Sequence, residues 1–300
     1  MSASPHQTDP APAGSRSDWL ADKVLRGLIG SMMRLPYRAR VPAMGAALAR
    51  GIGPLVGYRR RAEANLARIW PEMGVLDRRA LATAVCDNFG RTLIENYSWR
   101  DFADHLADTA PTGPGLDALA EATAAGRPVL FVTGHFGNHE APRQVLTRLG
   151  YVIGGLYRPM ANPYFDAHYA ATMTSWGGPV FAQGRRGTIG FARHIAQGGM
   201  GTLLFDVHQA AGRPIDFLGH PAMTVTSAAD IALKYDAILM PYFGTRQPDG
   251  LSFAVEIEAP IPHSDPLTMM TEATRRLEAR IRAHPAQWFW VHRRWKPAPP

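Results

Sequence analysis

A histidine and a glutamate five positions apart are the residues of this sequence best suited to acid–base chemistry. His135 and Glu140 lie in a segment that reads T-G-H-F-G-N-H-E. Imidazole gains and loses its proton near neutral pH, and a carboxylate beside it can fix its tautomer and stabilise the imidazolium. We therefore expect His135 to act as a general base on a hydroxyl group and Glu140 to orient it.

Two other roles are open for this segment. His135 could be a structural histidine inside the core. His135, His139 and Glu140 could instead form the site of a metal-dependent hydrolase, because helical metal ligands often stand four residues apart. Gly137 lies between the two histidines at an expected turn, which weakens that geometry. We expect no metal ion here.

The segment stands where a predicted strand gives way to a predicted helix. Residues 128–132 are a short apolar run typical of a buried strand, and residues 141–149 have a helical pattern that ends before Gly150. In open α/β sheets, the carboxyl ends of strands border a crevice where ligands bind. His135 is thus expected to face a cleft.

Alternating strands and helices extend over the rest of the chain. The predicted strands are 129–133, 152–157, 180–182, 202–205, 237–243 and 253–257, and the predicted helices are 140–149, 163–176, 187–197 and 226–235. This alternation predicts an α/β fold, with a single mixed, largely parallel sheet flanked by helices on both faces. We expect it to form one domain over residues 111–300.

The first part of the chain has a different pattern. Residues 1–17 are polar and contain prolines, which is typical of a disordered tail without a secretory signal. Residues 18–110 are predicted to be a helical region, with helices at 18–33 and 78–97, the last capped by Asp77, and an apolar segment at 41–56. Basic and apolar residues between 18 and 61 favour contact with an anionic membrane surface, although a helical cap on the main domain would give the same pattern. No apolar run is long enough to predict a membrane-spanning helix.

Charge and cysteine content narrow the class of protein. A net charge of +7 and a pI near 9.8 suit a nucleic acid, an anionic membrane or an acidic carrier protein as partner. No known nucleic-acid-binding module is visible, so we expect no nucleic acid. Cys86 is the only cysteine, which excludes an intrachain disulfide and favours an intracellular location.

Further candidates for substrate binding follow other predicted strands. Arg158 could bind a phosphate or a developing oxyanion. Asn162 is a weaker candidate, because Pro163 after it favours a helix N-cap. Asp206 could hold Arg158, orient a hydroxyl or cap a turn.

Arg185 is the last candidate for substrate binding. With Arg186 it forms an arginine pair flanked by glycines, which could face an anionic substrate. Solvent-exposed arginines give the same pattern.

The spacing H-x4-E resembles the signature of the glycerolipid acyltransferase superfamily. Four other blocks resemble one branch of it, the lipid A biosynthesis lauroyl and myristoyl acyltransferases. These blocks are R-x3-N-L at 61–66, Y-R-P-x-x-N-P at 157–163, F-L-G-x-P-A at 217–222 and P-x-Q-W-x-W-x-H-x-R-W-K at the C-terminus. Asp206 falls on a functional acid of the family. The chain departs from the family in lacking its usual hydrophobic anchor helix and in having Leu218 in place of an aromatic residue.

The resemblance implies an O-acyltransferase without a bound cofactor. Such an enzyme moves a fatty acyl group from acyl carrier protein, or from acyl-CoA, to a hydroxyl of a phosphorylated glycolipid, a lipid A precursor of lipopolysaccharide. A lysophospholipid or another lipid hydroxyl is the alternative acceptor. The resemblance also implies a peripheral or weakly anchored place on the cytoplasmic face of the inner membrane. The sequence contains no G-x-S-x-G elbow, which agrees with direct transfer and no covalent intermediate.

Overall fold

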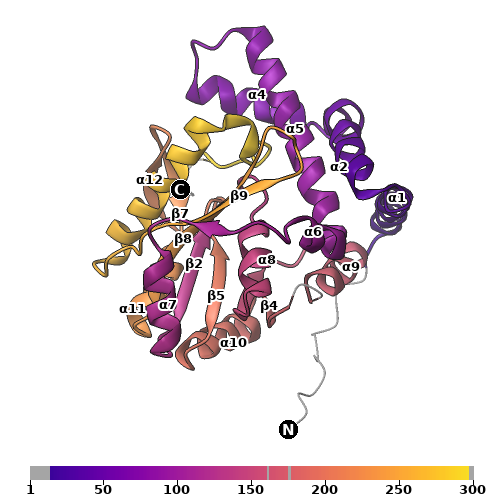
Figure 1. The fold of residues 1–300 in the computed structure, drawn as a ribbon. Helices are drawn as coiled ribbons and strands as arrows, with labels where there is room; N and C mark the ends of the chain where they lie inside the picture. Colours follow the sequence, from indigo (N-terminus) through magenta and orange to yellow (C-terminus); the bar gives the residue numbers. More distant parts are fainter. Residues whose placement is uncertain (1–13, 161, 175–176, 297–300) are drawn as a thin grey trace.

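The centre of the protein is a mixed β-sheet (Figure 1). The computed structural model describes residues 14–160, 162–174 and 177–296. Within these residues the sheet has seven strands, in the order β1 (Pro111–Thr112), β9 (Phe253–Ile257), β8 (Ile238–Arg246), β2 (Val129–Thr133), β5 (Met200–Leu204), β3 (Ile153–Tyr157) and β4 (Val180–Ala182). Neighbouring strands are parallel except for β8 and β9, which are antiparallel. The predicted α/β class and largely parallel sheet are confirmed.

Helices cover both faces of this sheet, as the side chains of β2 show. Leu130 and Val132 belong to one buried apolar cluster, together with residues of α10, α11 and α12. Val129 and Phe131 belong to another, together with residues of α7 and α8. Because successive side chains of a strand point to opposite faces, β2 is buried on both sides and forms an unbroken apolar run. These helices are α7 (Leu116–Ala124), α8 (Ala141–Arg148), α10 (Arg185–Ala196), α11 (Ser227–Lys234) and α12 (Pro266–Ala283).

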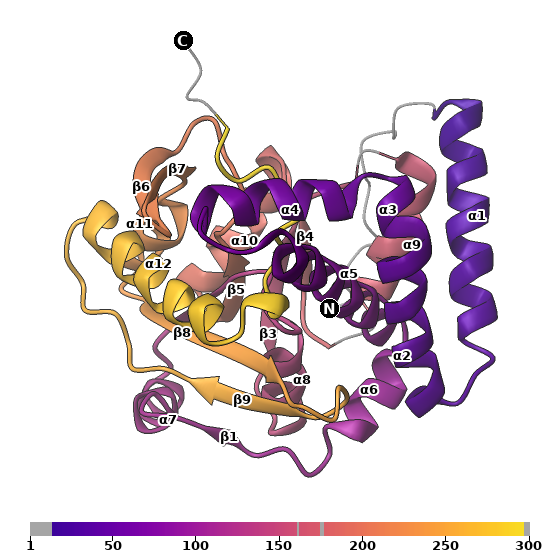
Figure 2. The same cartoon turned by 90° about the horizontal axis from the view of Figure 1, so that it is seen from above.

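The described residues before β1 are mainly helical. It forms α1 (Arg16–Met32), α2 (Tyr37–Ala46), a π-helix (Ala47–Ile52), α3 (Gly53–Leu55), α4 (Tyr58–Ile69), α5 (Val75–Tyr97) and α6 (Trp99–His105). Figure 2 shows α1 at the edge of the molecule, beside α2 and α9 (Pro163–Thr174). Residues of α4 and α5, among them Leu66 and Val85, belong to the same apolar cluster as the sheet. The N-terminal helices therefore share a core with the sheet.

The helix boundaries correct several predictions. Ser15 caps α1, which begins at Arg16, inside the segment predicted to be a tail; residues 1–13 of that segment lie outside the described residues. Helix α5 begins at Val75 after Gly74, so Asp77 is not its N-cap. Asp77 lies in the first turn, where its negative charge stabilises the helix. The apolar segment 41–56 is divided among α2, the π-helix and α3.

Two elements at the C-terminal side were absent from the prediction. One is α12. The other is a hairpin of β6 (Arg213–Phe217) and β7 (His220–Thr224), joined by Leu218 and Gly219. Both linking residues have positive φ, 56° and 84°, as in a two-residue hairpin turn. Leucine is uncommon in that conformation, so the turn has no clear sequence signal.

The surface of the N-terminal helices bears apolar residues. Trp19, Leu20 and Val24 are exposed on α1, and Leu55 and Val56 are exposed around α3. Among the described helices, none is both long and apolar enough to cross a membrane.

Candidate active site

His135 lies just beyond the carboxyl end of β2, in the segment 134–140 that leads into α8. Its side chain is 32% exposed, so it is not sealed in the core. Gly137 has a φ of +55°, and a Cβ there would collide with the carbonyl oxygen of Gly244 in β8. A glycine therefore lets this segment turn back against the sheet.

Asp206 holds His135 by two hydrogen bonds. Its Oδ1 lies 2.8 Å from Nδ1 of His135, and its Oδ2 accepts the backbone N–H of His135 at 2.7 Å. Oδ2 also accepts the indole N–H of Trp288 at 2.8 Å. The Asp206 side chain is 1% exposed. Burial opposes its ionisation, but the contacts with His135 and Trp288 outweigh that effect and hold the pKa of Asp206 well below its usual range.

This geometry determines the tautomer of the histidine. An ionised carboxylate can only accept, so Nδ1 of His135 carries the proton that it donates to Asp206. Nε2 then has a free lone pair, and no described residue forms a hydrogen bond with it. The rings of Phe289 and His139 lie 5.5 Å and 5.3 Å from the His135 ring. The arrangement can therefore take a proton on Nε2 and stabilise the resulting positive charge through Asp206.

Glu140 does not occupy the place that the sequence predicted for it. The position beside Nδ1 of His135 belongs to Asp206, and the Glu140 carboxylate lies 3.6 Å from Nη1 of Arg143 and 3.8 Å from Nε2 of His139. Glu140 immediately precedes α8, so its side chain lies beside Arg143, three residues later in the helix. The prediction that Glu140 orients His135 is therefore wrong, and Asp206 holds that position.

The ionisation of Glu140 and His139 reflects their burial. Burial raises the pKa of Glu140 to about 7, although Arg143 opposes the shift. Burial lowers the pKa of His139 to about 3, with a smaller contribution from His135. At neutral pH, His139 is uncharged and Glu140 is partly protonated.

The role expected for Asp206 changes too. Its oxygens are occupied by His135 and Trp288, and its side chain is buried, so it neither holds Arg158 nor meets a substrate hydroxyl. Trp288 belongs to the C-terminal aromatic block, whose Trp288, Trp290 and Trp295 are all buried in the main apolar cluster. That block completes the core.

His135 borders a cavity of about 290 Å³. Glu140, His139 and Arg158 border it too, as does Gln183. Much of the remaining lining is apolar and comes from Leu156, Met160, Met173, Leu203, Leu204, Phe205, Val207, Val225 and Ala228. The cavity thus joins a proton acceptor, a cation and an apolar wall.

The other two candidates lie outside this lining. Oδ1 of Asn162 accepts the backbone N–H groups of Tyr164 and Phe165 at 3.0 Å and 3.2 Å, and Nδ2 donates to the carbonyl of Asp18 at 2.7 Å. Asn162 therefore caps α9, as Pro163 after it predicted, and links this helix to α1; it does not border the cavity. Arg185 is exposed at the start of α10 and does not border the cavity.

The metal-site alternative finds no support in this geometry. His135 and His139 do not share a helix, because α8 begins only at Ala141. Nδ1 of His135 is bound to Asp206. Within the part of the chain that the structure describes, no group of three or more His, Cys, Asp or Glu residues could hold a metal ion.

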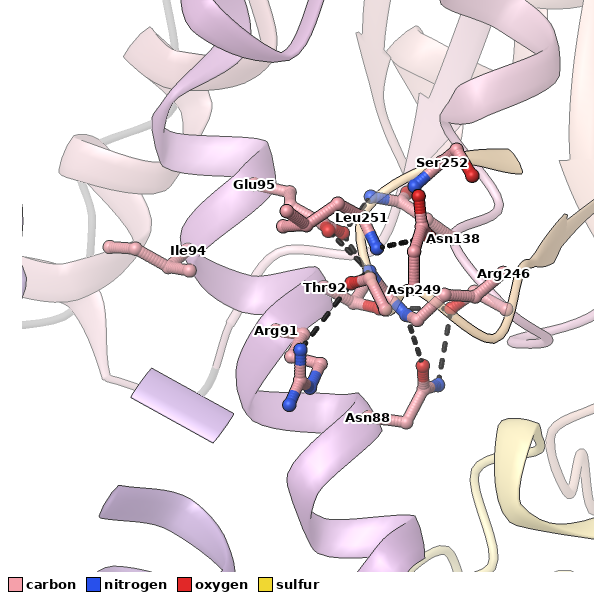
Figure 3. Close-up of polar contacts among 12 residues, drawn as sticks. Asn88, Arg91, Thr92, Ile94, Glu95, Asn138, Arg246, Asp249, Leu251 and Ser252 are labelled. Carbon is pink, nitrogen blue, oxygen red and sulfur yellow. Dashed lines mark hydrogen bonds and ion pairs between the residues drawn. The ribbon is translucent and has the colours of Figure 1, made fainter. Parts of the chain in front are cut away.

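A buried polar cluster holds the segment 134–140 from its other side (Figure 3). Nδ2 of Asn138 donates to Glu95 at 2.9 Å, and Oδ1 of Asn138 accepts the backbone N–H of Glu140 at 3.0 Å. Thr92 donates to the carbonyl of Gly137 at 2.9 Å. We call Asn88, Thr92, Glu95, Asn138 and Arg246 the Glu95 cluster. This cluster has no sequence signal, because its members are distant in the chain.

Arg246 completes this cluster from β8. Its guanidinium pairs with both carboxylate oxygens of Glu95, at 2.8 Å for Nη2. It also donates to Asn88 at 2.8 Å and to Thr92 at 3.2 Å. The side chains of Glu95 and Arg246 are 0% and 6% exposed. Since buried charges are stable only when paired and hydrogen-bonded, this cluster is a rigid support for the loop that carries His135.

Comparison with known proteins identifies the family. Residues 17–297 match the bacterial lipid A biosynthesis acyltransferases. The chain is 23% identical over 282 residues to lipid A biosynthesis acyltransferase 2 of Shigella flexneri, covering 88% of this chain and 86% of that protein. It is 25% identical over 299 residues to the lipid A biosynthesis lauroyltransferase of Escherichia coli K12, covering 91% and 90%. The lipid A biosynthesis acyltransferase of Haemophilus influenzae is 24% identical over 180 residues, which cover 59% of this chain and 56% of that protein. Since the family match extends over most of the chain, this protein belongs to the bacterial lipid A biosynthesis acyltransferases and is an acyltransferase.

Proposed function

We propose that this enzyme moves a fatty acyl group from the thioester of acyl carrier protein to a hydroxyl of a phosphorylated lipid A precursor. The observation that carries the proposal is the free Nε2 of His135 at a largely apolar cavity, with Nδ1 held by Asp206. The names of the relatives support the lipid acceptor. The apolar lining suits an acyl chain.

In the proposed reaction, Nε2 of His135 takes the proton of the acceptor hydroxyl. The hydroxyl oxygen attacks the thioester carbonyl, a C–O bond forms and the C–S bond breaks. The imidazolium, stabilised by Asp206, then returns its proton to the departing thiolate. General-base catalysis of this kind contributes about 10²- to 10⁴-fold to the rate.

No covalent acyl-enzyme is needed in this scheme. Cys86 is fully buried in α5, and burial raises the pKa of its thiol to about 11, which makes it a poor nucleophile. Direct attack by the acceptor therefore requires no thiol of this chain.

Arg158 and Glu140 have proposed roles at the thioester. Arg158 borders the cavity and supplies a fixed positive charge for the carbonyl oxygen as it becomes negative. Glu140, whose pKa burial raises to about 7, donates a hydrogen bond to the same oxygen when it is protonated. In this proposal Glu140 is catalytic without orienting His135.

The exposed apolar residues of α1 are proposed to meet an anionic membrane. Trp19, Leu20 and Val24 are exposed on α1, and Lys23 and Arg26 of the same helix are also exposed. This pattern suits a helix lying in the headgroup layer, on the cytoplasmic face of the inner membrane. Co-sedimentation with vesicles rich in anionic lipid tests it. Binding that is unchanged in the variant Trp19→Ser/Leu20→Ser would contradict it.

An acyl-transfer assay with purified protein tests the reaction. Donors are acyl carrier protein and CoA loaded with chains of several lengths, and acceptors are phosphorylated lipid A precursors and lysophospholipids, with products identified by mass spectrometry. We expect transfer to the lipid A precursor and a fall of at least about 10²-fold in His135→Ala, with unchanged circular dichroism. Near-normal transfer by this variant would refute the assignment of the base. Transfer to lysophospholipid alone would replace the proposed acceptor.

A further inference from the structure

A second, smaller cavity lies between α4 and the C-terminal segment. Its volume is about 230 Å³, and we call it the basic cavity. Its lining contains three cationic side chains and no acidic one. The lining residues are Tyr58, Arg61, Phe289, Val291, His292, Arg293 and Lys296.

The backbone of the C-terminal segment is fixed by α4. Nδ2 of Asn65 donates to the carbonyls of Trp290 and His292 at 2.6 Å and 2.8 Å, and Arg61 donates to the carbonyl of Val291 at 3.1 Å. Trp290 itself is buried in the core. The wall that carries Arg293 is therefore held in place, which is a requirement of a preorganised binding site.

The cations of the basic cavity have no acidic partners. Within the described part of the chain, no carboxylate lies within ion-pair distance of Arg61, Arg293 or Lys296. Arg59, two residues away on the same helix, is by contrast 3.6 Å from Glu63. Like charges that converge without counter-charge favour a bound anion, and guanidinium groups match phosphate oxygens in geometry.

The ring of Phe289 lies between the basic cavity and His135, the proposed base. Phe289 borders it and also stacks on His135, with 5.5 Å between ring centroids and 29° between planes. The apolar cavity described above borders His135 as well. His135 therefore lies close to both an apolar wall and a cationic one.

We propose that the basic cavity binds a phosphate ester of one of the two substrates. The inference rests on the proposed function, in which each substrate carries phosphate. The donor has the phosphodiester of its phosphopantetheine arm, and the acceptor has the phosphate monoester of its sugar. Arg61 and Arg293 provide planar forks for phosphate oxygens, and Lys296 provides a point charge. The anchored phosphate keeps its substrate beside His135, while the acyl chain occupies the apolar cavity.

The test removes two of the charges without touching the core. Arg293→Gln/Lys296→Gln changes two exposed side chains of the cavity. The matched control, Arg68→Gln/Arg79→Gln, removes the same charge from exposed positions of α4 and α5 outside the cavity. Transfer is measured with acyl-phosphopantetheine against acyl-pantetheine, and with phosphorylated against dephosphorylated acceptor.

We expect the wild type to prefer the phosphorylated form in at least one arm of this experiment. In the cavity variant that preference should fall about tenfold or more, through a higher KM for the phosphorylated substrate with kcat little changed. The control should keep the preference of the wild type. The arm that responds identifies the source of the phosphate. A variant that keeps both preferences, or a control that loses as much, overturns the proposal.

A binding measurement separates this inference from the proposed function. Calorimetry with a phosphopantetheine thioether and with a phosphorylated disaccharide lipid needs no turnover. Wild-type protein that transfers no acyl group contradicts the proposed function alone. The basic cavity is then judged by affinity. The proposal is supported if one probe binds about tenfold more weakly to the cavity variant than to the control. It is overturned if each probe binds the cavity variant as tightly as it binds the control.

Discussion

The segment 134–140 is held on two sides by a carboxylate paired with a base, and the two pairs differ in one respect. Arg246 has protein partners for each of its guanidinium nitrogens, and its pair with Glu95 is sealed inside the protein. His135 is held by Asp206 at one nitrogen only, and its other nitrogen is free beside a cavity. The Glu95–Arg246 pair has no free nitrogen, so it can only support the loop. The Asp206–His135 pair has a free ring nitrogen, so it can exchange a proton with a substrate.

Among changes to the residues that hold the segment 134–140, Asp206→Asn should cause the largest loss of activity. The amide has one accepting and one donating group, so it no longer enforces the tautomer with a free lone pair on Nε2, and it cannot stabilise an imidazolium by charge. By analogy with the Asp to Asn change in the Ser-His-Asp triad, kcat should fall on the order of 10³-fold or more. Steady-state kinetics of the folded variant provides the test. A loss of less than tenfold would show that Asp206 is only a structural partner.

The variant Glu95→Gln should instead destabilise the fold. It leaves the guanidinium of Arg246 buried without its counter-charge, which typically costs about 3–5 kcal/mol. Urea unfolding should show this loss, and kcat of the remaining folded enzyme should change far less than in Asp206→Asn.

A double variant serves as the control for Glu95. Glu95→Gln/Arg246→Met removes both charges, so its loss of stability should be smaller than the sum of the two single losses. If the losses add, the two side chains do not act as a pair. A Glu95→Gln protein as stable as the wild type would contradict the comparison itself.

Glu140 is the third carboxylate, and its effect depends on pH. Its pKa is raised from 4.5 to about 7 by burial, so between these values the folded protein binds a proton that the unfolded chain releases. Wild-type stability relative to Glu140→Gln should therefore fall as the pH rises from 4.5 to 7, by up to about 3 kcal/mol. Urea unfolding of both proteins at several pH values measures this difference. A constant difference would contradict the raised pKa.

Activity provides a second test of Glu140. The amide of Glu140→Gln keeps a hydrogen-bond donor at the cavity, whereas Glu140→Ala removes it. If Glu140 donates to the oxyanion, Glu140→Gln should lose less than tenfold in kcat and Glu140→Ala about 10²-fold, the typical value of one oxyanion donor. Equal losses in the two variants would exclude this role.

The sequence predicted the strand that carries His135, but not the partner of His135. β2 is buried on both faces, so it could be recognised as an apolar run with correct ends. The partner depends on strand order, which periodicity does not contain. β2 and β5 are parallel neighbours in which Thr133 is level with Leu204, and His135 and Asp206 each follow two residues later. Glu140 is the acid close to His135 in sequence, but the chain alone does not show which strand ends meet.

The Glu95 cluster was invisible for a similar reason. Glu95 lies in α5, and its partner Arg246 is 151 residues away. A glutamate within a helix is usually solvent-exposed, so nothing local marks this one as buried. Residues whose environment is formed by distant elements are the part of the site that required the structure.

Asn138 connects the Glu95 cluster to the loop that carries His135. Its replacement should have the smallest effect of these variants, and it tests whether the cluster and the Asp206–His135 pair act independently. Asn138→Ala removes the hydrogen bond to Glu95 and the one from the backbone of Glu140, while Arg246 remains paired with Glu95. The expected cost is about 1–3 kcal/mol of stability, together with a fall of a few fold in kcat at unchanged KM. The double variant Asn138→Ala/Asp206→Asn tests whether the two residues act independently. If Asn138 only supports the loop, the two losses in kcat, expressed as activation free energies, should add. Coupling above about 1 kcal/mol would mean that the buried side sets the position of His135 through Asp206 as well.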